Sequence, residues 1–250
     1  MGYLDGAGAV VTGGSRGIGR AIVRRLAADG ATVVFSYVAN EPAAGNLVTD
    51  VTANGGTATA VQADAADAAA VERLFQTAED VFTDTGVALR VCVLNAGMAD
   101  HAPLAEVSTQ RYDAIMAVNA RGAFLALQQA ARRTAHNGRI VAISSTGTAW
   151  PSAGEAVYAA SKAALEQFVR VASRELGHRG VTVNIVSPGP TDTDLLRADV
   201  TPEARAEVAH MTALGRVGQP VDIANVVSAL LSPDAAWLTG QNLRADGGLV

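Results

Sequence analysis

A tyrosine and a lysine stand four residues apart in the segment "VYAASK", which runs from Val157 to Lys162. If this segment is helical, Tyr158 and Lys162 share one face and their side chains can meet. A phenol beside an ammonium group is either a surface contact or a pair that performs chemistry. The choice between the two depends on what else the fold brings to the same place.

A glycine-rich segment, "TGGSRGIG" from Thr12 to Gly19, follows the first predicted strand and opens the first predicted helix. Glycines permit a tight turn and close backbone approach, and a helix N-terminus favours an anion. The segment is not a P-loop, because Arg20 and Ala21 replace the required lysine and hydroxyl residue. Its spacing is T-G-x-x-x-G-x-G rather than G-x-G-x-x-G. We interpret it as a phosphate-binding turn, with a βα turn that binds no ligand as the alternative.

The choice of dinucleotide depends on Arg16 in this turn and on Ser36 and Tyr37 at the end of the second predicted strand. A cofactor with a bare ribose usually meets an acidic residue at that place, and the segment "FSYVAN" contains none. Arginine and hydroxyl groups instead attract a ribose phosphate. The sequence therefore favours NADP over NAD, unless Arg16 is only a solvated surface charge.

Short apolar segments alternate with longer helical patterns along the whole chain. Uninterrupted apolar strands separated by helices indicate a parallel sheet covered on both faces. The first helix carries Ile18, Ile22 and Leu26 on one stripe and is closed by Gly30. We predict one doubly wound α/β domain over residues 1–250, with ligands beyond the carboxyl ends of the strands. The expected strands are "AVVTG", "TVVFS", "TATAVQ", "VCVLNAG", "RIVAISS", "VTVNIVS" and a short one near 240–244, and further helices are expected near 41–54, 67–84, 107–135, 155–179 and 220–231.

The segment from about Pro188 to Gly218 fits the alternation of apolar strands and helices least well. It contains a polar helical pattern that starts at Pro202. A long insertion at the carboxyl end of a strand is often a binding lid. We expect a substrate lid at about 190–215, and a wandering surface loop is the alternative.

The composition excludes several classes of function. The formal charge of −5 lacks the basic surface of a nucleic-acid binder, and Cys92 is the only cysteine. The N-terminus does not resemble a secretory signal, and no apolar run approaches the roughly 18 residues of a membrane span. The histidines have no metal-like spacing, so no metal site is expected. We expect a soluble, cytoplasmic protein that does not bind membranes.

Five motifs, "TGGSRGIG", "LNAG", "ISS", "YAASK" and "NIVSPG", follow one another in this order along the chain. With them the sequence resembles the short-chain dehydrogenase/reductase family over essentially its whole length. Each motif is weak alone, whereas five in the family's order and spacing are specific. The resemblance implies a Rossmann-type domain with a seven-stranded parallel sheet and helices on both faces. It also implies a homotetramer formed through the long helices at about 107–135 and 155–179.

The resemblance assigns roles to individual residues. It implies Tyr158 as the catalytic acid/base, Lys162 as its activator, Ser145 as the hydroxyl that orients the carbonyl, and Asn119 of "VNARG" as the anchor of a proton relay. Ser145 is preferred to Ser144 because it lies thirteen residues before Tyr158, the interval common in the family. The turn that begins at Asn95 would meet the adenosine ribose, Asp64 the adenine, and the segment from Pro188 the nicotinamide. The residues expected at the cofactor are Gly13, Ser15, Arg16, Gly17, Ile18, Gly19, Ser36, Tyr37, Asp64, Ala65, Asn95, Ala96, Gly97, Tyr158, Lys162, Pro188, Gly189, Thr191 and Thr193.

Ketone reduction explains why these residue types are needed. Hydride addition to carbon leaves negative charge on oxygen, so a proton donor must stand beside that oxygen. A phenol with a pKa of about 10 rarely loses its proton at neutral pH, so it would release and regain the proton too slowly. An ammonium about 4 Å away would lower that pKa by about three units at an effective dielectric near 20. We therefore expect Lys162 to lower the pKa of Tyr158 and to bridge the nicotinamide ribose, and Ser145 to steady the oxyanion.

The leading hypothesis is NADPH-dependent reduction of a ketone to an alcohol. The substrate could be a 3-oxoacyl thioester, for which His136 and Arg179 stand near the places of the basic carrier-docking residues in related reductases. The alternatives are a dehydrogenase of sugars, polyols, steroids or aromatic polyketides, and a non-catalytic NADP sensor. Sensors of this fold commonly lose the tyrosine or lysine, and this chain keeps both. Met98 and Trp150 are expected at the mouth of the site, where they either line an apolar pocket or pack.

Overall fold

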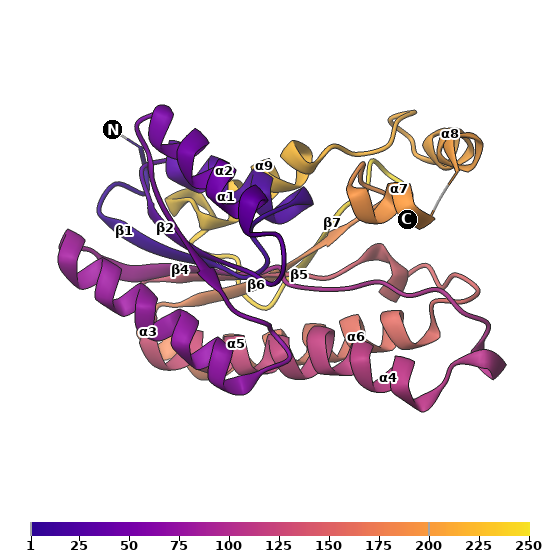
Figure 1. The fold of residues 1–250 in the computed structure, drawn as a ribbon, viewed down its shortest axis with the longest axis horizontal. Coiled ribbons are helices and arrows are strands. Elements are labelled where there is room, and N and C mark those ends of the chain that lie inside the picture. The colour runs from indigo at the N-terminus through magenta and orange to yellow at the C-terminus, as the bar shows by residue number, and fades with distance from the viewer. Residues whose placement is uncertain (1, 200) are drawn as a thin grey trace.

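The computed structural model describes residues 2–199 and 201–250. Within them, seven parallel strands form one sheet in the order β3-β2-β1-β4-β5-β6-β7, with helices on both faces (Figure 1). The predicted doubly wound α/β fold is confirmed. The strands are β1 (Ala7–Val11), β2 (Thr32–Tyr37), β3 (Thr57–Gln62), β4 (Ala88–Leu94), β5 (Arg139–Ile143), β6 (Thr182–Pro188) and β7 (Asn242–Ala245).

The two faces of the sheet pack against different sets of helices. One face packs against α1 (Gly17–Ala28), α2 (Glu41–Ala53) and α9 (Pro220–Leu231), and the other against α3 (Ala68–Thr85), α5 (Ala123–Arg133) and α6 (Ala156–Leu176) (Figure 1). Because successive side chains of a strand point to opposite faces, Ala9 and Val11 of β1 lie in the first core and Val10 lies in the second. This double burial is why β1 is apolar without alternation.

The helix expected over 107–135 is interrupted. The structure has α4 (Thr109–Met116), a π-helical segment (Ala117–Gly122) and then α5. The helical segment expected near 107–135 is therefore present, but its π-turn was not predicted, because a π-turn carries an extra residue that periodicity of 3.6 does not reveal. Such insertions are frequent at functional sites, and Asn119 lies within this one.

Two helices fill the segment between β6 and α9. They are α7 (Asp194–Asp199) and α8 (Pro202–Met211), and Figure 1 shows both beyond one end of the sheet. The helix with Pro202 at its start is confirmed, with Thr201 Oγ1 accepting from Ala204 N at 3.3 Å as its cap. The sequence did not predict α7. Val200, part of the expected lid, lies outside the described residues.

Short 3₁₀ turns complete the connections, at Leu104–Glu106, Thr146–Thr148, Gly177–Arg179 and Pro233–Ala235. Among the residues that the structure describes, no helix has both the length and the apolar character needed to cross a membrane. The ends of the predicted elements agree with the structure to within a few residues, for example Asn242–Ala245 for the strand expected near 240–244.

Candidate functional site

The glycine-rich turn joins β1 to α1 at the carboxyl end of the sheet. Gly13 and Gly17 have φ angles of 68° and 53°, in the left-handed region that favours glycine. A β-carbon on Gly19 would lie 2.1 Å from Gly13 O, so only glycine fits there. Arg16 is the N-cap of α1, and its side chain makes no capping hydrogen bond. The turn thus leaves the first amides of α1 without a side-chain cap, and this cradle fits a phosphate group.

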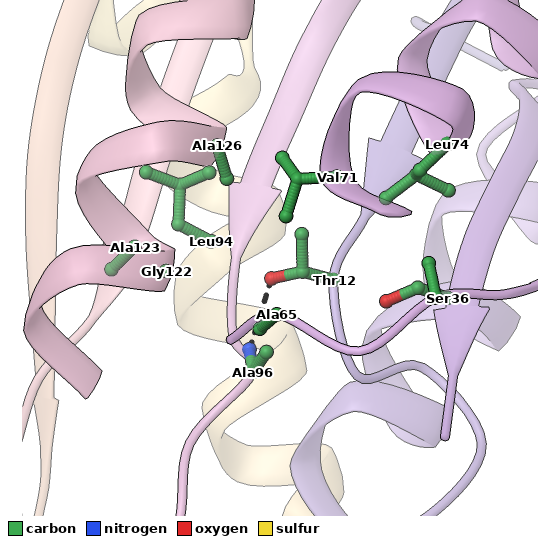
Figure 2. Close-up of a pocket in the computed structure, with 11 residues that line it drawn as sticks. Thr12, Ser36, Ala65, Val71, Leu74, Leu94, Ala96, Gly122, Ala123 and Ala126 are labelled. Carbon is green, nitrogen blue, oxygen red and sulfur yellow. Dashed lines mark hydrogen bonds between the residues drawn. The ribbon is translucent and has the colours of Figure 1, made fainter. Parts of the chain in front are cut away.

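Thr12 and Asn95 connect this turn to the turn after β4. Thr12 Oγ1 accepts from Asn95 N at 3.0 Å and from Ala96 N at 2.9 Å, and Figure 2 shows the second of these bonds. Asn95 Nδ2 donates to Thr12 O and Gly13 O at 3.0 and 2.9 Å. The two turns therefore form one rigid platform. Thr12 was not among the residues predicted at the cofactor, although it begins the glycine motif.

Ser36 at the end of β2 also supports the glycine turn. Its hydroxyl is buried and accepts from Gly13 N at 2.9 Å. Ser36, Ala65 and Ala96 line a small, mostly apolar pocket beside α3 and α5 (Figure 2). Asp64 is exposed, and its Oδ1 accepts from Ala66 N at 2.9 Å.

The side chain of Arg16 is exposed at the other side of the turn. It lines an open cleft of about 440 Å³ together with Arg20, Arg24 and Asp192. Arg24 forms an ion pair with Asp50, whose oxygen lies 2.7 Å from its Nε. Among the described residues, no hydrogen bond or ion pair of the Arg16 side chain is found.

Lys162 is the only lysine in the sequence; the other basic residues counted with it are arginines. It is buried in α6, and its Nζ donates to Ile143 O at 2.9 Å. The Nζ atom lies 6.0 Å from the centroid of the Tyr158 ring. Burial lowers the pKa of Lys162 from 10.5 to about 8. The structure therefore brings Tyr158 and Lys162 close together, and the lysine is buried.

The pKa of Tyr158 differs from the sequence-based expectation. Burial of the phenol raises its pKa above 10.0, hydrogen bonding with Ser145 opposes this rise, and the charge of Glu155 adds to it. The expected depression by Lys162 was wrong for the protein alone, because the ammonium is directed at Ile143 O. A raised pKa keeps the phenol protonated, which is the form that donates a proton to a ketone.

Asn119 is fully buried and lies beside Lys162. Its Oδ1 accepts from Met98 N at 2.9 Å, and its Nδ2 donates to Met98 O at 2.8 Å and to Ser161 Oγ at 3.1 Å. A β-carbon on Gly97 would lie 3.1 Å from Lys162 Nζ and 3.4 Å from Asn119 Oδ1. Asn119 therefore joins the π-helical segment to the turn after β4, next to the ammonium group.

The two serines that follow β5 have different environments. Ser145 is half-buried, and its Oγ accepts from Gly147 N at 3.1 Å. Ser144 is buried and donates to Glu166 Oε1 at 2.7 Å. Thr148 Oγ1 donates to the same carboxylate atom, also at 2.7 Å. Ser144 thus belongs to a supporting network, and Ser145 is the serine next to Tyr158.

The sequence reasoning missed Glu166. Its carboxylate is buried, binds the two residues that flank the Ser145 turn, and lies 3.5 Å from the guanidinium of Arg170. A signal was present in the sequence, because Tyr158, Lys162 and Glu166 follow one another at intervals of four and share one face of α6. We interpret Glu166 as a positioning residue for Ser145.

Replacement of Glu166 should affect turnover through Ser145. We expect Glu166→Ala to lower kcat about tenfold, since charge-assisted hydrogen bonds contribute about 1.5–3 kcal/mol each, while the KM for NADPH stays unchanged. Glu166→Gln should retain most activity because its amide oxygen still accepts. Steady-state kinetics measures this, with Glu175→Ala on the same helix as the control. Wild-type kcat in Glu166→Ala would contradict the positioning role.

The end of β6 approaches the glycine turn from the opposite side. Thr146 Oγ1 donates to Pro188 O at 3.2 Å, and Gly189 N donates to Ala245 O at 3.0 Å. Further along, a β-carbon on Gly17 would lie 3.3 Å from Thr193 Cγ2. Residues from distant parts of the chain thus surround one site, although Asp64 lies at its exposed margin.

Comparisons with known proteins agree with this geometry. A family model described as enoyl-(acyl carrier protein) reductase matches residues 13–250. An uncharacterized oxidoreductase of Methylorubrum extorquens is 41% identical over 251 residues, 100% of both chains. Elsinochrome reductase 1 of Elsinoe fawcettii is 37% identical over 256 residues, covering 98% of this chain and 94% of its own. The solved structure of a Burkholderia cenocepacia short chain dehydrogenase in complex with NADP is 40% identical, covers 99% of both chains and has a TM-score of 0.92. The chain belongs to the short-chain dehydrogenase/reductase family of oxidoreductases.

Proposed function

We propose that this protein reduces a ketone to an alcohol with NADPH. The observation that carries the proposal is the convergence of Tyr158 and Ser145 at Gly147, beside Lys162, the only lysine of the chain. The names of two relatives support it, since one is a reductase and one was solved with NADP. A non-catalytic sensor is less well supported, because both Tyr158 and Lys162 are present.

The residues present fit a dinucleotide. The uncapped start of α1 would hold the pyrophosphate, with Gly13 and Gly17 allowing close approach. We assign the adenosine to the turn that begins at Asn95 and the nicotinamide to the segment after Pro188. When bound, the reduced nicotinamide supplies the hydride.

The remaining chemistry belongs to side chains of this protein. Ser145 donates to the carbonyl oxygen and steadies the charge that develops there. Tyr158 donates its proton to the same oxygen. Lys162, charged below a pKa of about 8, stabilises the phenolate that remains. We assign Asn119 the role of anchoring the route by which Tyr158 regains a proton.

The preference for NADPH should depend on Arg16. The exposed guanidinium would bind the ribose phosphate, and a charge-assisted hydrogen bond contributes about 1.5–3 kcal/mol. Arg16→Ala should therefore raise the KM for NADPH about tenfold or more and leave the KM for NADH within about twofold. Initial rates with both cofactors measure this. Arg90→Ala, near the amino end of β4, is the control and should leave both KM values unchanged. Equal use of NADH and NADPH by the wild type would overturn the assignment of Arg16.

We further propose that residues 190–215 form the substrate lid and that the protein is a homotetramer. Exposed apolar side chains on α5 and α6 support the assembly: Phe124 is 42% exposed and Val171 48% exposed. The ring of Phe124 packs edge-on against Phe168, with centroids 5.3 Å apart. Burial of this surface between copies would be favourable. Sedimentation velocity measures the assembly state.

Several classes of ketone are candidate substrates. A 3-oxoacyl thioester is less favoured by the structure, because Arg179 donates to Thr134 O and Ala131 O at the end of α5 and is engaged there rather than free for an acidic carrier. Sugars, polyols, steroids and aromatic polyketides are the alternatives. A screen that follows NADPH absorbance with acetoacetyl thioesters, quinones, sugars and steroids tests the proposed function. Absence of turnover with every carbonyl compound would contradict it.

A further inference from the structure

A carboxylate stands at the reacting end of the site, and the mechanism above does not use it. Glu155 precedes α6 and lies three residues before Tyr158. A β-carbon on Gly147 would lie 3.2 Å from Glu155 Oε2, 3.3 Å from Ser145 Oγ and 4.0 Å from Tyr158 Cε1. The carboxylate, the hydroxyl and the phenol ring therefore converge on Gly147.

The fold does not use this carboxylate for a contact of its own. Glu155 is the N-cap of α6, yet its side chain makes no capping hydrogen bond. Among the described residues, no hydrogen bond or ion pair of the Glu155 carboxylate is found, whereas the buried Glu166 receives two hydroxyl donors. Glu155 is half-buried, and burial raises its pKa. The carboxylate therefore remains available to accept a hydrogen bond from a bound molecule.

The surroundings hold Glu155 in place. Ala102 N donates to Gly154 O at 3.0 Å, which joins the loop after β4 to the start of α6. A β-carbon on Gly154 would lie 2.4 Å from His101 Nε2, so the imidazole packs against Gly154, the residue before Glu155. The charge of His101 lowers the pKa of Glu155 and partly opposes the effect of burial.

We propose that Glu155 selects ketones that carry a hydroxyl or ammonium donor on a carbon next to the carbonyl. This inference rests on the proposed function. Because Glu155 Oε2 and Ser145 Oγ both lie near Gly147, a donor on the carbon next to a carbonyl bound at Ser145 would be within reach of Glu155 Oε2. The alternative is that Glu155 only interacts with the dipole of α6, as acidic residues at helix starts often do.

A matched series of aromatic ketones distinguishes these roles. The probes are acetophenone, α-hydroxyacetophenone, the methyl ether of the latter, and α-aminoacetophenone as its ammonium form. We expect the wild type to prefer the hydroxyl compound over its methyl ether about tenfold in kcat/KM, as one hydrogen bond to a charged group predicts. Glu155→Ala should bring this ratio to about one. Glu155→Gln should keep part of the hydroxyl preference and lose the ammonium preference.

The control makes the same chemical change at another helix start. Glu41 is an exposed acidic residue in the first turn of α2, and Glu41→Gln should leave every ratio unchanged. A wild type that reduces all four ketones equally would overturn the inference and leave ketone reduction standing. Absence of turnover with all four, together with a failed carbonyl screen, would overturn the proposed function and this inference with it. Unchanged ratios in Glu155→Ala would assign Glu155 to the helix dipole alone.

Discussion

Replacement of Tyr158 with phenylalanine should abolish ketone reduction and leave NADPH binding intact. The phenol is half-buried, burial raises its pKa so that it stays protonated at neutral pH, and Ser145 lies beside it. Phenylalanine preserves the ring and removes the hydroxyl proton that Tyr158 transfers to the carbonyl oxygen. Since a positioned general acid contributes about 100- to 10,000-fold, we expect kcat to fall at least about 1,000-fold.

Two measurements on the Tyr158→Phe variant separate catalysis from binding. NADPH absorbance with a ketone that the wild type reduces measures turnover, and fluorescence titration measures the Kd for NADPH. Tyr112 on α4 is 46% exposed, so Tyr112→Phe is the matched control and should behave as the wild type. A Tyr158→Phe variant with a substantial fraction of wild-type kcat would show that another group donates the proton.

Lys162→Met should also lower activity strongly, and it should change the pH profile. Methionine keeps the length of the side chain and removes the charge that stabilises the phenolate. We expect kcat/KM to fall at least about 100-fold. In the wild type, Lys162 loses its proton as pH rises through about 8. The kcat/KM for NADPH, which reports groups of the free enzyme, should therefore decline above that pH, and the residual activity of the variant should not.

The single lysine permits a direct test of this titration. Protein made with isotopically labelled lysine has one labelled side chain, so an NMR pH titration reports Lys162 alone. We expect a midpoint near 8 instead of 10.5. Because the unfolded chain binds the proton up to the ordinary pKa of 10.5, the free energy of unfolding should increase as pH rises from about 8 to 10.5. This increase should be absent in Lys162→Met, and an unshifted midpoint would contradict the buried position of the lysine.

Much of the fold could be predicted because its signals are local. The apolar strands, the stripe that includes Ile22 and Leu26 of α1, and the polar helix that begins at Pro202 depend on residues close together in sequence. Their spacing follows the geometry of the strand or helix directly. The order of five short motifs was enough to indicate the family, because four of them mark the carboxyl ends of β1, β4, β5 and β6 and "YAASK" lies at the start of α6.

Other features could not be predicted because they arise between distant residues. The π-helical turn around Asn119 accompanies the contacts of its side chain with Met98 and Ser161, which are 21 and 42 residues away. The expected depression of the Tyr158 pKa failed for the same reason, because Ile143 O, 19 residues from Lys162, receives the ammonium group.

By itself the sequence determined the fold class, the glycine-rich turn and the residues that we propose for the reaction, because these follow from residue type and local spacing. The tertiary structure alone decided which groups are buried and which partners they have. It gave Ser144 and Ser145 different environments, brought Glu166 into contact with Ser144 and Thr148, and left Glu155 near Tyr158 without a donor among the described residues. Burial and charge depend on every element that packs around a side chain, and the linear order of residues does not contain that information directly.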